Sequence, residues 1–379
     1  MSKGIILLSA GGTGGHLFPA EALAHELTTR GWEIHLATDD RAQKYASNFP
    51  AQQTHIIPSA SPSGGNPINM LKAAYALYKG VRASKLLISK LQPKAVIGFG
   101  GYPTVPPLVA AAGKVPTMIH EQNAVAGRAN KMLSGRVSAI AGGFLKAEGP
   151  DAHKIIVTGN PIRPPVREAA KVAYMPHTKT GPIKLVVFGG SQGAQFFSKT
   201  FPEALALMPQ SIRERLVVTQ QARPEDETAA KMLYSQMGVK AEVASFFDDL
   251  PMRIGGAHLV MARAGASTVS EIAAIGRPSI LVPYPFALDH DQAANAEALA
   301  AAGGAMVMRQ DDLDAQTMAD ALMKMFDAPD ELAKMAAAAK AAGKPDAAIL
   351  LADLTEAIAS GHTVAEYKAA HSDRLSPAA

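Results

Sequence analysis

The sequence predicts an α/β protein in which two doubly wound halves follow one another and face each other across a cleft. The chain has 379 residues, 48% of them hydrophobic, which is enough for two domains with cores of their own. Short apolar runs of strand length alternate with helical patterns in both halves. Several of these runs end in glycine-rich loops, and parallel sheets bind ligands beyond the carboxyl ends of their strands, which predicts the cleft.

Near-continuous apolar runs predict the strands of the first half, since a parallel strand is covered on both faces. These runs are Gly4–Ser9, Glu33–Thr38, Ala95–Phe99, Thr117–His120, Ala139–Ala141 and Ile155–Val157. A helix is predicted from Pro19 to Leu27, because proline suits a first helical turn. The amphipathic stretch 70–91 predicts a second helix, which either covers the sheet or lays an apolar and basic face on an anionic membrane.

The second half repeats the pattern. Its predicted strands are Lys184–Phe188, Leu216–Thr219, Ala241–Ala244, Leu259–Ala262, Ser279–Val282 and Met306–Met308. Thr268 and Glu271 have the spacing of a capping box, which predicts a helix that starts there and ends at Gly276. Further helices are predicted from Asp314 and over Ala347–Ile358, followed by a loosely held tail over 360–379. The glycines and prolines of 159–165 predict a boundary between domains 1–161 and 162–345.

Composition narrows the classes of function. The chain has no cysteine, which excludes disulfides and cysteine-based metal sites and favours a reducing compartment. The net charge of +4 is not concentrated in one block, so nucleic acid is not indicated, whereas phosphorylated ligands or anionic lipid fit. We find no secretory signal, no membrane span, no metal-ligand spacing and no cofactor motif. The acidic pairs at 248–249 and 311–314 are expected to be helix caps or solvated loop residues.

Two glycine loops and a histidine are candidates for anion binding and acid–base chemistry in the first half. Gly11–Gly15 misses the dinucleotide and Walker spacings, but its N–H groups can bind an anion, as can those of Gly98–Gly101. Histidine titrates near neutrality, so His16, at the mouth of the first loop, is the first candidate for a general base. The alternative is a hydrogen-bonded structural histidine.

Polar residues at two further strand ends have two interpretations each. The four polar side chains of His120-Glu121-Gln122-Asn123 are costly to bury unless they find hydrogen-bond partners, which favours a functional cluster. Glu121 is the second candidate for the base. His120 is either part of that function or a core histidine with satisfied hydrogen bonds. Glu271 is either a capping carboxylate or an acceptor for sugar or ribose hydroxyls.

Seven motifs occur together in the order GGTGGH, GFGGYPTVPP, HEQNAVAGRANK, GNPIR, GGSQGAQ, ARAGASTVSEIAAIGRPSILVPYP and DHDQAANA. Over roughly 4–350 they closely resemble the MurG family of bacterial UDP-N-acetylglucosamine:lipid I N-acetylglucosaminyltransferases. The resemblance implies a GT-B fold with an acceptor domain over 1–161, a UDP-GlcNAc domain over 162–345, and a last helical segment, ~346–379, that returns to the first domain.

The resemblance also implies the reaction and its location. GlcNAc would pass with inversion from UDP-GlcNAc to the 4-hydroxyl of MurNAc in lipid I, which gives lipid II with a β-1,4 bond for peptidoglycan synthesis. The partners would be UDP-GlcNAc, lipid I and the cytoplasmic face of the inner membrane, to which the protein would bind peripherally, without a cofactor. Backbone N–H groups and helix N-termini would stabilise the leaving diphosphate without a metal.

Site residues follow from the resemblance motif by motif. Donor contacts would come from Thr13, Gly14, Gly15, Asn123, Arg163, Ser191, Phe247, Ala266, Ser267, Thr268, Val269, Ser270, Glu271 and Gln292. Of these, Arg163 would face the diphosphate or the uridine of the donor, and Ser191 would bind the diphosphate. Glu271 would contact the ribose hydroxyls, Gln292 the GlcNAc hydroxyls, and the Phe247 backbone the uracil. The acceptor diphosphate would lie on Gly14, Gly15, Gly100, Gly101 and Tyr102. The chain departs from the family pattern at two places. Asp291 precedes Gln292, where the family often has two adjacent glutamines, and PTVPP follows GFGGY, where the family commonly has a glycine-rich continuation.

Three alternatives stay open. The nearest is another GT-B enzyme acting on a UDP-sugar, either a glycolipid glycosyltransferase or a UDP-GlcNAc epimerase, which product analysis separates. A nicotinamide dehydrogenase is disfavoured by the missing GxGxxG motif. A non-catalytic nucleotide-sugar-binding protein would return the donor intact.

Overall fold

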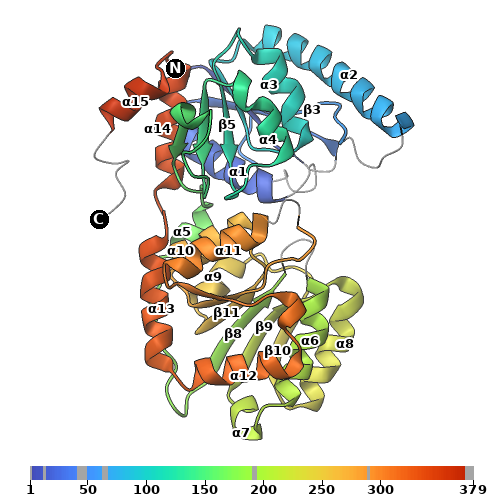
Figure 1. The fold of residues 1–379 in the computed structure, drawn as a ribbon, viewed down its shortest axis with the longest axis vertical. Helices are drawn as coiled ribbons and strands as arrows, with labels where there is room; N and C mark the ends of the chain where they lie inside the picture. The colour runs from blue at the N-terminus through green and yellow to red at the C-terminus, as the bar shows by residue number, and fades with distance from the viewer. Residues whose placement is uncertain are drawn as a thin grey trace. The chain divides into compact units, whose positions relative to one another are not determined.

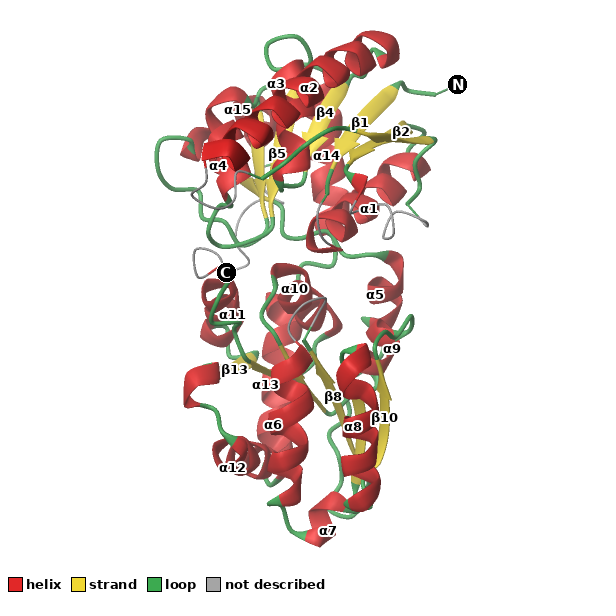
Figure 2. Cartoon of the chain, turned by 90° about the vertical axis from the view of Figure 1, so that its right-hand side faces the viewer, coloured by secondary structure: helices red, strands yellow, loops and turns green. Residues whose placement is uncertain are grey.

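The computed structural model describes residues 2–11, 14–40, 49–61, 67–189, 194–287 and 291–371. The chain divides into unit 1, Met1–Arg163 with Asp346–Ala379, and unit 2, Pro164–Pro345 (Figure 1). Each unit contains one parallel sheet, and Figure 2 shows helices on both sides of its strands. The predicted α/β class with two doubly wound sheets is confirmed.

The sheet of unit 1 reverses its strand order next to its first strand. Its described strands are β1 (Ile5–Ser9), β2 (Glu33–Thr38), β3 (Gln53–Ile56), β4 (Ala95–Gly98), β5 (Thr117–Glu121), β6 (Ala139–Gly142) and β7 (Ile155–Val157). Their order is β3-β2-β1-β4-β5-β6-β7, so the loops after β1 and β4 meet at the carboxyl edge. β3 was not predicted, because this exposed edge strand has no apolar run.

Helices cover both faces of this sheet, because alternate strand residues point to opposite sides. Ile6 and Leu8 pack with α1 (Gly14–Thr29), α14 (Ala347–Ala359) and α15 (Val364–Ala370). Leu7 packs with α2 (Pro67–Leu91), α3 (Val105–Ala111) and α4 (Arg128–Leu133) on the other face. Short 3-10 turns lie at Tyr102–Thr104, Ser134–Arg136 and Ala152–Lys154.

Unit 2 has the same strand order with one strand fewer among the described residues. The strands are β8 (Ile183–Phe188), β9 (Leu216–Gln221), β10 (Lys240–Ala244), β11 (Leu259–Ala262), β12 (Ser279–Leu281) and β13 (Ala305–Val307), in the order β10-β9-β8-β11-β12-β13. The helices are α5 (Pro164–Ala169), α6 (Ala194–Ala206), α7 (Gln210–Arg213), α8 (Pro224–Gln236), α9 (Leu250–Gly255), α10 (Ala266–Ile275), α11 (Asp291–Ala301), α12 (Ala315–Phe326) and α13 (Pro329–Ala342), with a 3-10 turn at Gln310–Asp312.

Two helix starts differ from the prediction. α1 begins at Gly14, so Pro19 lies inside the helix, where it removes one backbone hydrogen bond, and not in its first turn. α10 begins at Ala266 with Gly265 as its N-cap, and that N-cap makes no side-chain hydrogen bond. The predicted capping box of Thr268 and Glu271 is therefore wrong. The predicted end of α10 is confirmed, since Gly276 caps it in the left-handed conformation with φ 75°.

The C-terminal helices belong to unit 1. Arg30, which directly follows α1, donates from Nη1 to Asp353 at 2.7 Å and to Glu356 at 2.8 Å, and this fastens α14 to the end of α1. The prediction of a loose tail is wrong for α15. Thr363 and Glu366 form a capping box at its start, and its apolar residues Val364 and Tyr367 are buried. Residues 372–379 lie outside the described residues. None of the helices in the described ranges has both the length and the hydropathy to span a membrane.

Candidate functional site

The carboxyl edge of unit 1 brings the first two glycine loops into contact. A Cβ on Gly11 would lie 2.6 Å from Pro103 Cγ, so the loops fit only with glycine at this position. A Cβ on Gly100 would lie 3.1 Å from His16 Cδ2 and 3.2 Å from its Nε2. Gly100 has φ 93°, a conformation that favours glycine. The His16 ring therefore rests on the backbone of the second loop.

The hydrogen bonding of His16 settles which ring nitrogen carries the hydrogen in the neutral form. Nδ1 lies 3.0 Å from the carbonyl oxygen of Gly11. A carbonyl oxygen only accepts, so Nδ1 donates and Nε2 keeps the lone pair. Nε2 is also the nitrogen that lies against Gly100, and the side chain is partly exposed. An imidazole held through one nitrogen, with a lone pair on the other, has the arrangement of a general base.

Glu121 anchors the loop that follows β5. Its Oε1 accepts from the Asn123 backbone N–H at 3.0 Å and from Asn123 Nδ2 at 3.2 Å. Its Oε2 accepts from the Gly127 N–H at 2.9 Å and from Asn130 Nδ2 at 2.8 Å. The residue is only 2% exposed. Four donors on a buried carboxylate favour a positioning role, because both oxygens already hold the loop in place.

His120 is a fully buried histidine whose two nitrogens are both satisfied. Nε2 donates to the Gly159 carbonyl at 3.1 Å, and Nδ1 accepts from Gln122 Nε2 at 3.1 Å. Burial lowers the pKa of His120 to about 4, so the ring is neutral at neutral pH. Gln122 Nε2 also donates to the Phe99 carbonyl at 3.0 Å, and Asn160 Nδ2 donates to the Gln122 carbonyl at 3.0 Å. This network joins the ends of β4, β5 and β7, which supports the interpretation of His120 as a structural histidine.

Arg163, the last residue of unit 1 before the boundary, packs on α1. Its guanidinium lies 3.9 Å from the centroid of the Phe18 ring, a cation–π contact. Burial raises the pKa of Glu21, one helical turn further on, although the charges of Arg163 and His25 act in the opposite direction. Arg163 is thus placed on the helix that carries His16.

In unit 2, the N-terminus of α10 follows β11 at the carboxyl edge. Val269 and Ile272 are buried, whereas a polar face is partly exposed and consists of Ser267, Thr268, Ser270 and Glu271. The first N–H groups of a helix have no partner within the helix, which makes this end an anion site. Glu271 lies in the second turn of α10, away from the N-cap at Gly265, so it is not the capping carboxylate of this helix start.

Gln292 on α11 joins two loops of the same edge. Its Oε1 accepts from the Ala264 N–H at 3.2 Å, just after β11, and from the Tyr284 N–H at 3.0 Å, after β12. The amide nitrogen takes no part in these two bonds, and it is the atom that can donate to a sugar hydroxyl.

Arg263 is a buried cation in front of α10. It is 4% exposed, and its Nη1 donates to the carbonyls of Val282 and Pro283, both at 3.2 Å. Its Nη2 donates to the side-chain oxygen of Gln310. Burial lowers the pKa of Arg263 to about 10, which still leaves it charged at neutral pH. Sequence reasoning did not single out Arg263, although the ARAGAS motif contains it.

Phe247 follows β10 and is 8% exposed. The Arg253 guanidinium lies 4.4 Å from the centroid of its ring and is held by Asp249 and Glu242 at 2.7 and 2.6 Å. Asp249 is therefore an ion-pair partner, and Asp314 is the N-cap of α12. Within the described ranges, no three His, Asp or Glu side chains gather in a way that could hold a metal ion.

The structure connects several of the predicted residues within each unit. In unit 1, contacts connect the first loop and His16 with the second loop and Asn130, and Asn130 connects them with Glu121 and Asn123. In unit 2, Gln292 is tied to the loop that leads into Ala266–Glu271. Thr13 and Ser191 lie outside the described residues. Sequence reasoning missed Asn130 and Asn160, for which the only signal was a polar residue inside a quoted motif.

Comparison with known families and proteins gives consistent matches over nearly the whole chain. The glycosyltransferase family 28 N-terminal domain matches residues 6–142, and the family 28 C-terminal domain matches residues 184–351. A protein of Sinorhizobium fredii is 60% identical over 98% of this chain and 100% of its own length. A protein of Chelativorans sp. is 59% identical over 97% of this chain and 99% of its own. Both are named UDP-N-acetylglucosamine–N-acetylmuramyl-(pentapeptide) pyrophosphoryl-undecaprenol N-acetylglucosamine transferase.

Solved structures give the same fold. Acinetobacter baumannii MurG superposes with a TM-score of 0.74 at 26% identity and covers 93% of this chain and 98% of its own. A UDP-N-acetylglucosamine 2-epimerase superposes with a TM-score of 0.61 at 13% identity, covers 92% of this chain and 94% of its own, and so shares the fold alone. The predicted GT-B fold is confirmed.

Proposed function

The chain belongs to glycosyltransferase family 28, and we propose that it transfers GlcNAc from UDP-GlcNAc to the 4-hydroxyl of MurNAc in lipid I, which yields lipid II. The observation that carries the proposal is the 60% identity, over 98% of the chain, with a protein named for this activity. The two groups of residues at the sheet edges then receive separate roles.

The group in unit 1 activates the acceptor. His16 Nε2 accepts the proton of the 4-hydroxyl, while Nδ1 stays bonded to the Gly11 carbonyl. The hydroxyl oxygen attacks C1 of GlcNAc from the side opposite the diphosphate, the bond from C1 to the UDP oxygen breaks, and UDP leaves with the bonding electrons. Attack from the opposite side inverts C1 and gives the β-1,4 bond. The glycines 14, 15, 100 and 101, with Tyr102, hold the acceptor diphosphate through backbone N–H groups.

The loop anchored by Glu121 supports this step. Its four hydrogen bonds fix Asn123 and Asn130, and Asn130 Nδ2 would lie 3.6 Å from a Cβ on Gly100. A base works when its distance to the reacting hydroxyl is held constant, so a rigid loop beside His16 favours transfer. Glu121 is a positioning residue in this proposal, and His16 is the base.

The group in unit 2 holds the donor and stabilises its leaving group. The N–H groups at the start of α10 and the loop of Ser191 bind the diphosphate, and the buried charge of Arg263 adds to the positive potential there. Glu271 accepts hydrogen bonds from the ribose hydroxyls, and the Gln292 amide donates to GlcNAc. Arg163 and the Phe247 backbone complete the contacts with diphosphate and uracil.

Transfer to a lipid-linked acceptor also requires contact with a membrane surface, and one face of α2 fits this contact. The side chains that contribute to the core lie on one side of the helix and include Ala73, Gly80, Ser84 and Ile88. The opposite side exposes Ile68, Leu71, Tyr75, Tyr78 and Leu86 between Lys72, Lys79, Arg82 and Lys85. Leu71 and Leu86 are 71% and 75% exposed, which is unusual for leucine on a water-facing helix. Helix α2 thus covers the sheet with one face and lies on the anionic cytoplasmic leaflet with the other.

The reaction is tested by incubating the purified chain with UDP-GlcNAc and a lipid I analogue and identifying the products by mass spectrometry and NMR. We expect UDP and a GlcNAc-β-1,4-MurNAc product in equal amounts. An epimerised UDP-sugar, or donor recovered intact, would overturn the proposal in favour of an epimerase or a binding protein.

The membrane contact is tested by flotation with phosphatidylglycerol vesicles. Tyr75→Ser together with Leu86→Ser should reduce vesicle binding by about tenfold or more, because each change removes apolar surface that the membrane would cover. Met232→Ser on α8 is a matched control, since Met232 is 59% exposed, as is Tyr75. Transfer to a short-chain soluble acceptor should stay at the wild-type rate. Unchanged vesicle binding of the double variant would exclude α2 as the contact.

A further inference from the structure

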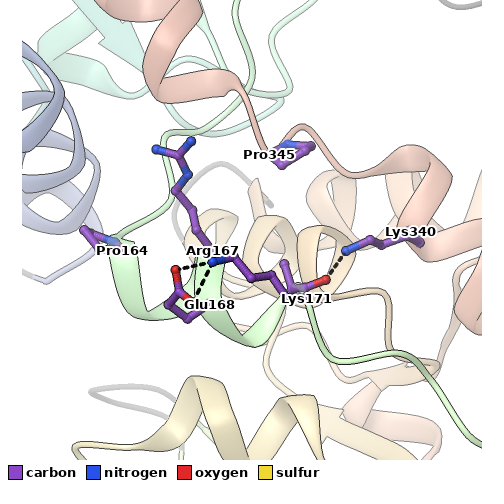
Figure 3. A pocket seen from close by; sticks show the side chains of 7 residues that line it. Pro164, Arg167, Glu168, Lys171, Lys340 and Pro345 are labelled. Carbon is purple, nitrogen blue, oxygen red and sulfur yellow. Dashed lines mark hydrogen bonds and ion pairs between the residues drawn. The ribbon is translucent and has the colours of Figure 1, made fainter.

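Unit 2 has a polar depression outside the residues assigned to the donor. It has a volume of about 410 Å³ and is lined by Pro164, Arg167, Glu168, Lys171, Lys340 and Pro345 (Figure 3). Arg167 extends from α5 on one side and Lys340 from α13 on the other. Pro164 and Pro345 are the first and last residues of unit 2, so the depression lies where the chain enters and leaves this unit.

The cations around this depression outnumber its carboxylates. Lys171 Nζ pairs with Glu168 Oε1 at 2.7 Å, but both side chains are largely exposed, at 70% and 64%, and such a pair contributes little stability. Among the described residues, Arg167 takes part in no ion pair. Arg167 lies on α5 and Lys171 follows two residues after the end of that helix, and both cations line the same depression.

Lys340 adds to the excess of positive charge. Its Nζ donates to the carbonyls of Ala170 at 2.7 Å and Ala274 at 2.8 Å. Burial, and after it the nearby charge of Arg277, lowers the pKa of Lys340. The positive charge of Arg277 therefore acts on this ammonium as a like charge. An anion in the depression would relieve the repulsion among these cations.

We propose that this depression binds a phosphate group, with the Arg167 fork and the Lys171 ammonium as its ligands and Lys340 as a nearby charge. A planar guanidinium matches two phosphate oxygens, and an exposed ammonium can turn from Glu168 to the anion. The group comes either from free inorganic phosphate or from an anionic lipid headgroup, since both present the same oxygens. A bound phosphate would link the segment that begins at Pro164 to the segment that ends at Pro345.

The test uses the full chain saturated with UDP, so that the donor site is already occupied. Binding of inorganic phosphate is measured by ³¹P NMR and by the shift of the unfolding temperature. Binding to phosphatidylglycerol vesicles, relative to phosphatidylcholine vesicles, is measured in the same buffer without phosphate. The variants are Arg167→Gln with Lys171→Gln, and the control Lys334→Gln, which removes an exposed charge from α13 outside the depression.

We expect the double variant to lose at least about tenfold in affinity in one of the two measurements, the phosphate arm or the vesicle arm, while Lys334→Gln keeps the wild-type affinity. Loss on the phosphate arm identifies free phosphate as the source, and loss on the vesicle arm identifies a lipid headgroup. Equal binding by the double variant and the wild type on both arms, or no binding by the wild type on either, would overturn the proposal. Neither result bears on the transfer reaction, because the donor site holds UDP throughout.

Discussion

The carboxyl edges of the two sheets share a strand order but are built in different ways. In unit 1, buried side chains hold the loops, with Glu121 and His120 each saturated by hydrogen bonds. In unit 2, the start of α10 follows β11 at the edge. Gln292 accepts from the Ala264 N–H just before this helix, and the buried Arg263 donates to the carbonyls of Val282 and Pro283. One edge is organised around fixed side-chain acceptors, and the other around backbone donors and a buried cation.

This difference matches the two halves of the proposed reaction. Removal of a proton needs a base held at a constant distance from its target, which a saturated network of side chains provides. Departure of a diphosphate needs donors and positive charge that are already in place when the negative charge develops. The same fold thus supports two kinds of site, and the distinction lies in the loops. Variants that damage only one edge test this comparison.

His16→Ala should produce the largest effect on the unit 1 side. We expect kcat to fall by about 10²–10⁴-fold, the usual contribution of a general base, while the KM for UDP-GlcNAc stays near the wild-type value. The measurement is steady-state kinetics with both substrates varied. His25→Ala, which changes a partly exposed histidine on the same helix, is the control. A kcat within about twofold of wild type would remove His16 as the base.

Glu271→Ala should damage the unit 2 side. A hydrogen bond to a charged acceptor contributes about 1.5–3 kcal/mol, so the KM for UDP-GlcNAc should rise by about 10–100-fold with a smaller change in kcat. The unfolding temperature of the variant, measured beside the kinetics, separates a loss of the ribose contact from a loss of the fold. Glu297→Ala on α11 removes an exposed carboxylate of the same unit and should leave donor kinetics unchanged. A normal KM for Glu271→Ala would contradict the ribose contact.

Glu121→Gln distinguishes positioning from proton transfer. The amide keeps one acceptor oxygen and gives up the other, so two of the four bonds are lost and kcat should fall by about tenfold. The measurement is kcat for this variant beside the wild type and His16→Ala, whose loss should be about 10²–10⁴-fold. A loss in Glu121→Gln as large as that of His16→Ala would make Glu121 the base.

Most of the fold was predictable because its signals are local. Apolar runs such as Leu259–Ala262 and breakers such as Gly276 depend on a few neighbouring residues, and the structure confirms them. The prediction failed where local signals mislead. Pro19 suits a helix start but lies inside α1, and the polar strand β3 depends on pairing with β2 alone.

The site was predictable as a set of motifs but not as a geometry. Nothing in the sequence indicates that His16 would rest on Gly100, which lies 84 residues further along, since strand order decides this contact. The roles within HEQN were also beyond sequence reasoning. Glu121 and His120 are adjacent in the chain, yet one anchors a loop through four donors and the other joins strand ends as a neutral ring.

The smallest predicted effect compares the two units through one histidine with a lowered pKa in each. Burial lowers the pKa of His120 in unit 1 and of His258 in unit 2 to about 4. A folded pKa below the unfolded value of about 6.5 means that the unfolded chain binds more protons between these pH values. Stability is therefore greatest above pH ~6.5 and falls toward pH ~4, by up to about 1.4 kcal/mol per pH unit for each fully buried histidine.

Unfolding of the full chain in urea from pH 7 to pH 4.5 measures this slope. His120→Gln and His258→Gln should each flatten this slope, His120→Gln more, because His120 is fully buried and His258 only half-buried.

The two variants should differ in activity. His258 bonds the Lys184 N–H, at the amino end of β8, so its variant should transfer GlcNAc at the wild-type rate. His120→Gln breaks the bonds to Gly159 and Gln122 at the carboxyl edge and should slow transfer by about threefold to tenfold, the value of about 1 kcal/mol of hydrogen bonding. Equal activity of the two variants would show that the buried network of unit 1 stabilises the fold without positioning the base.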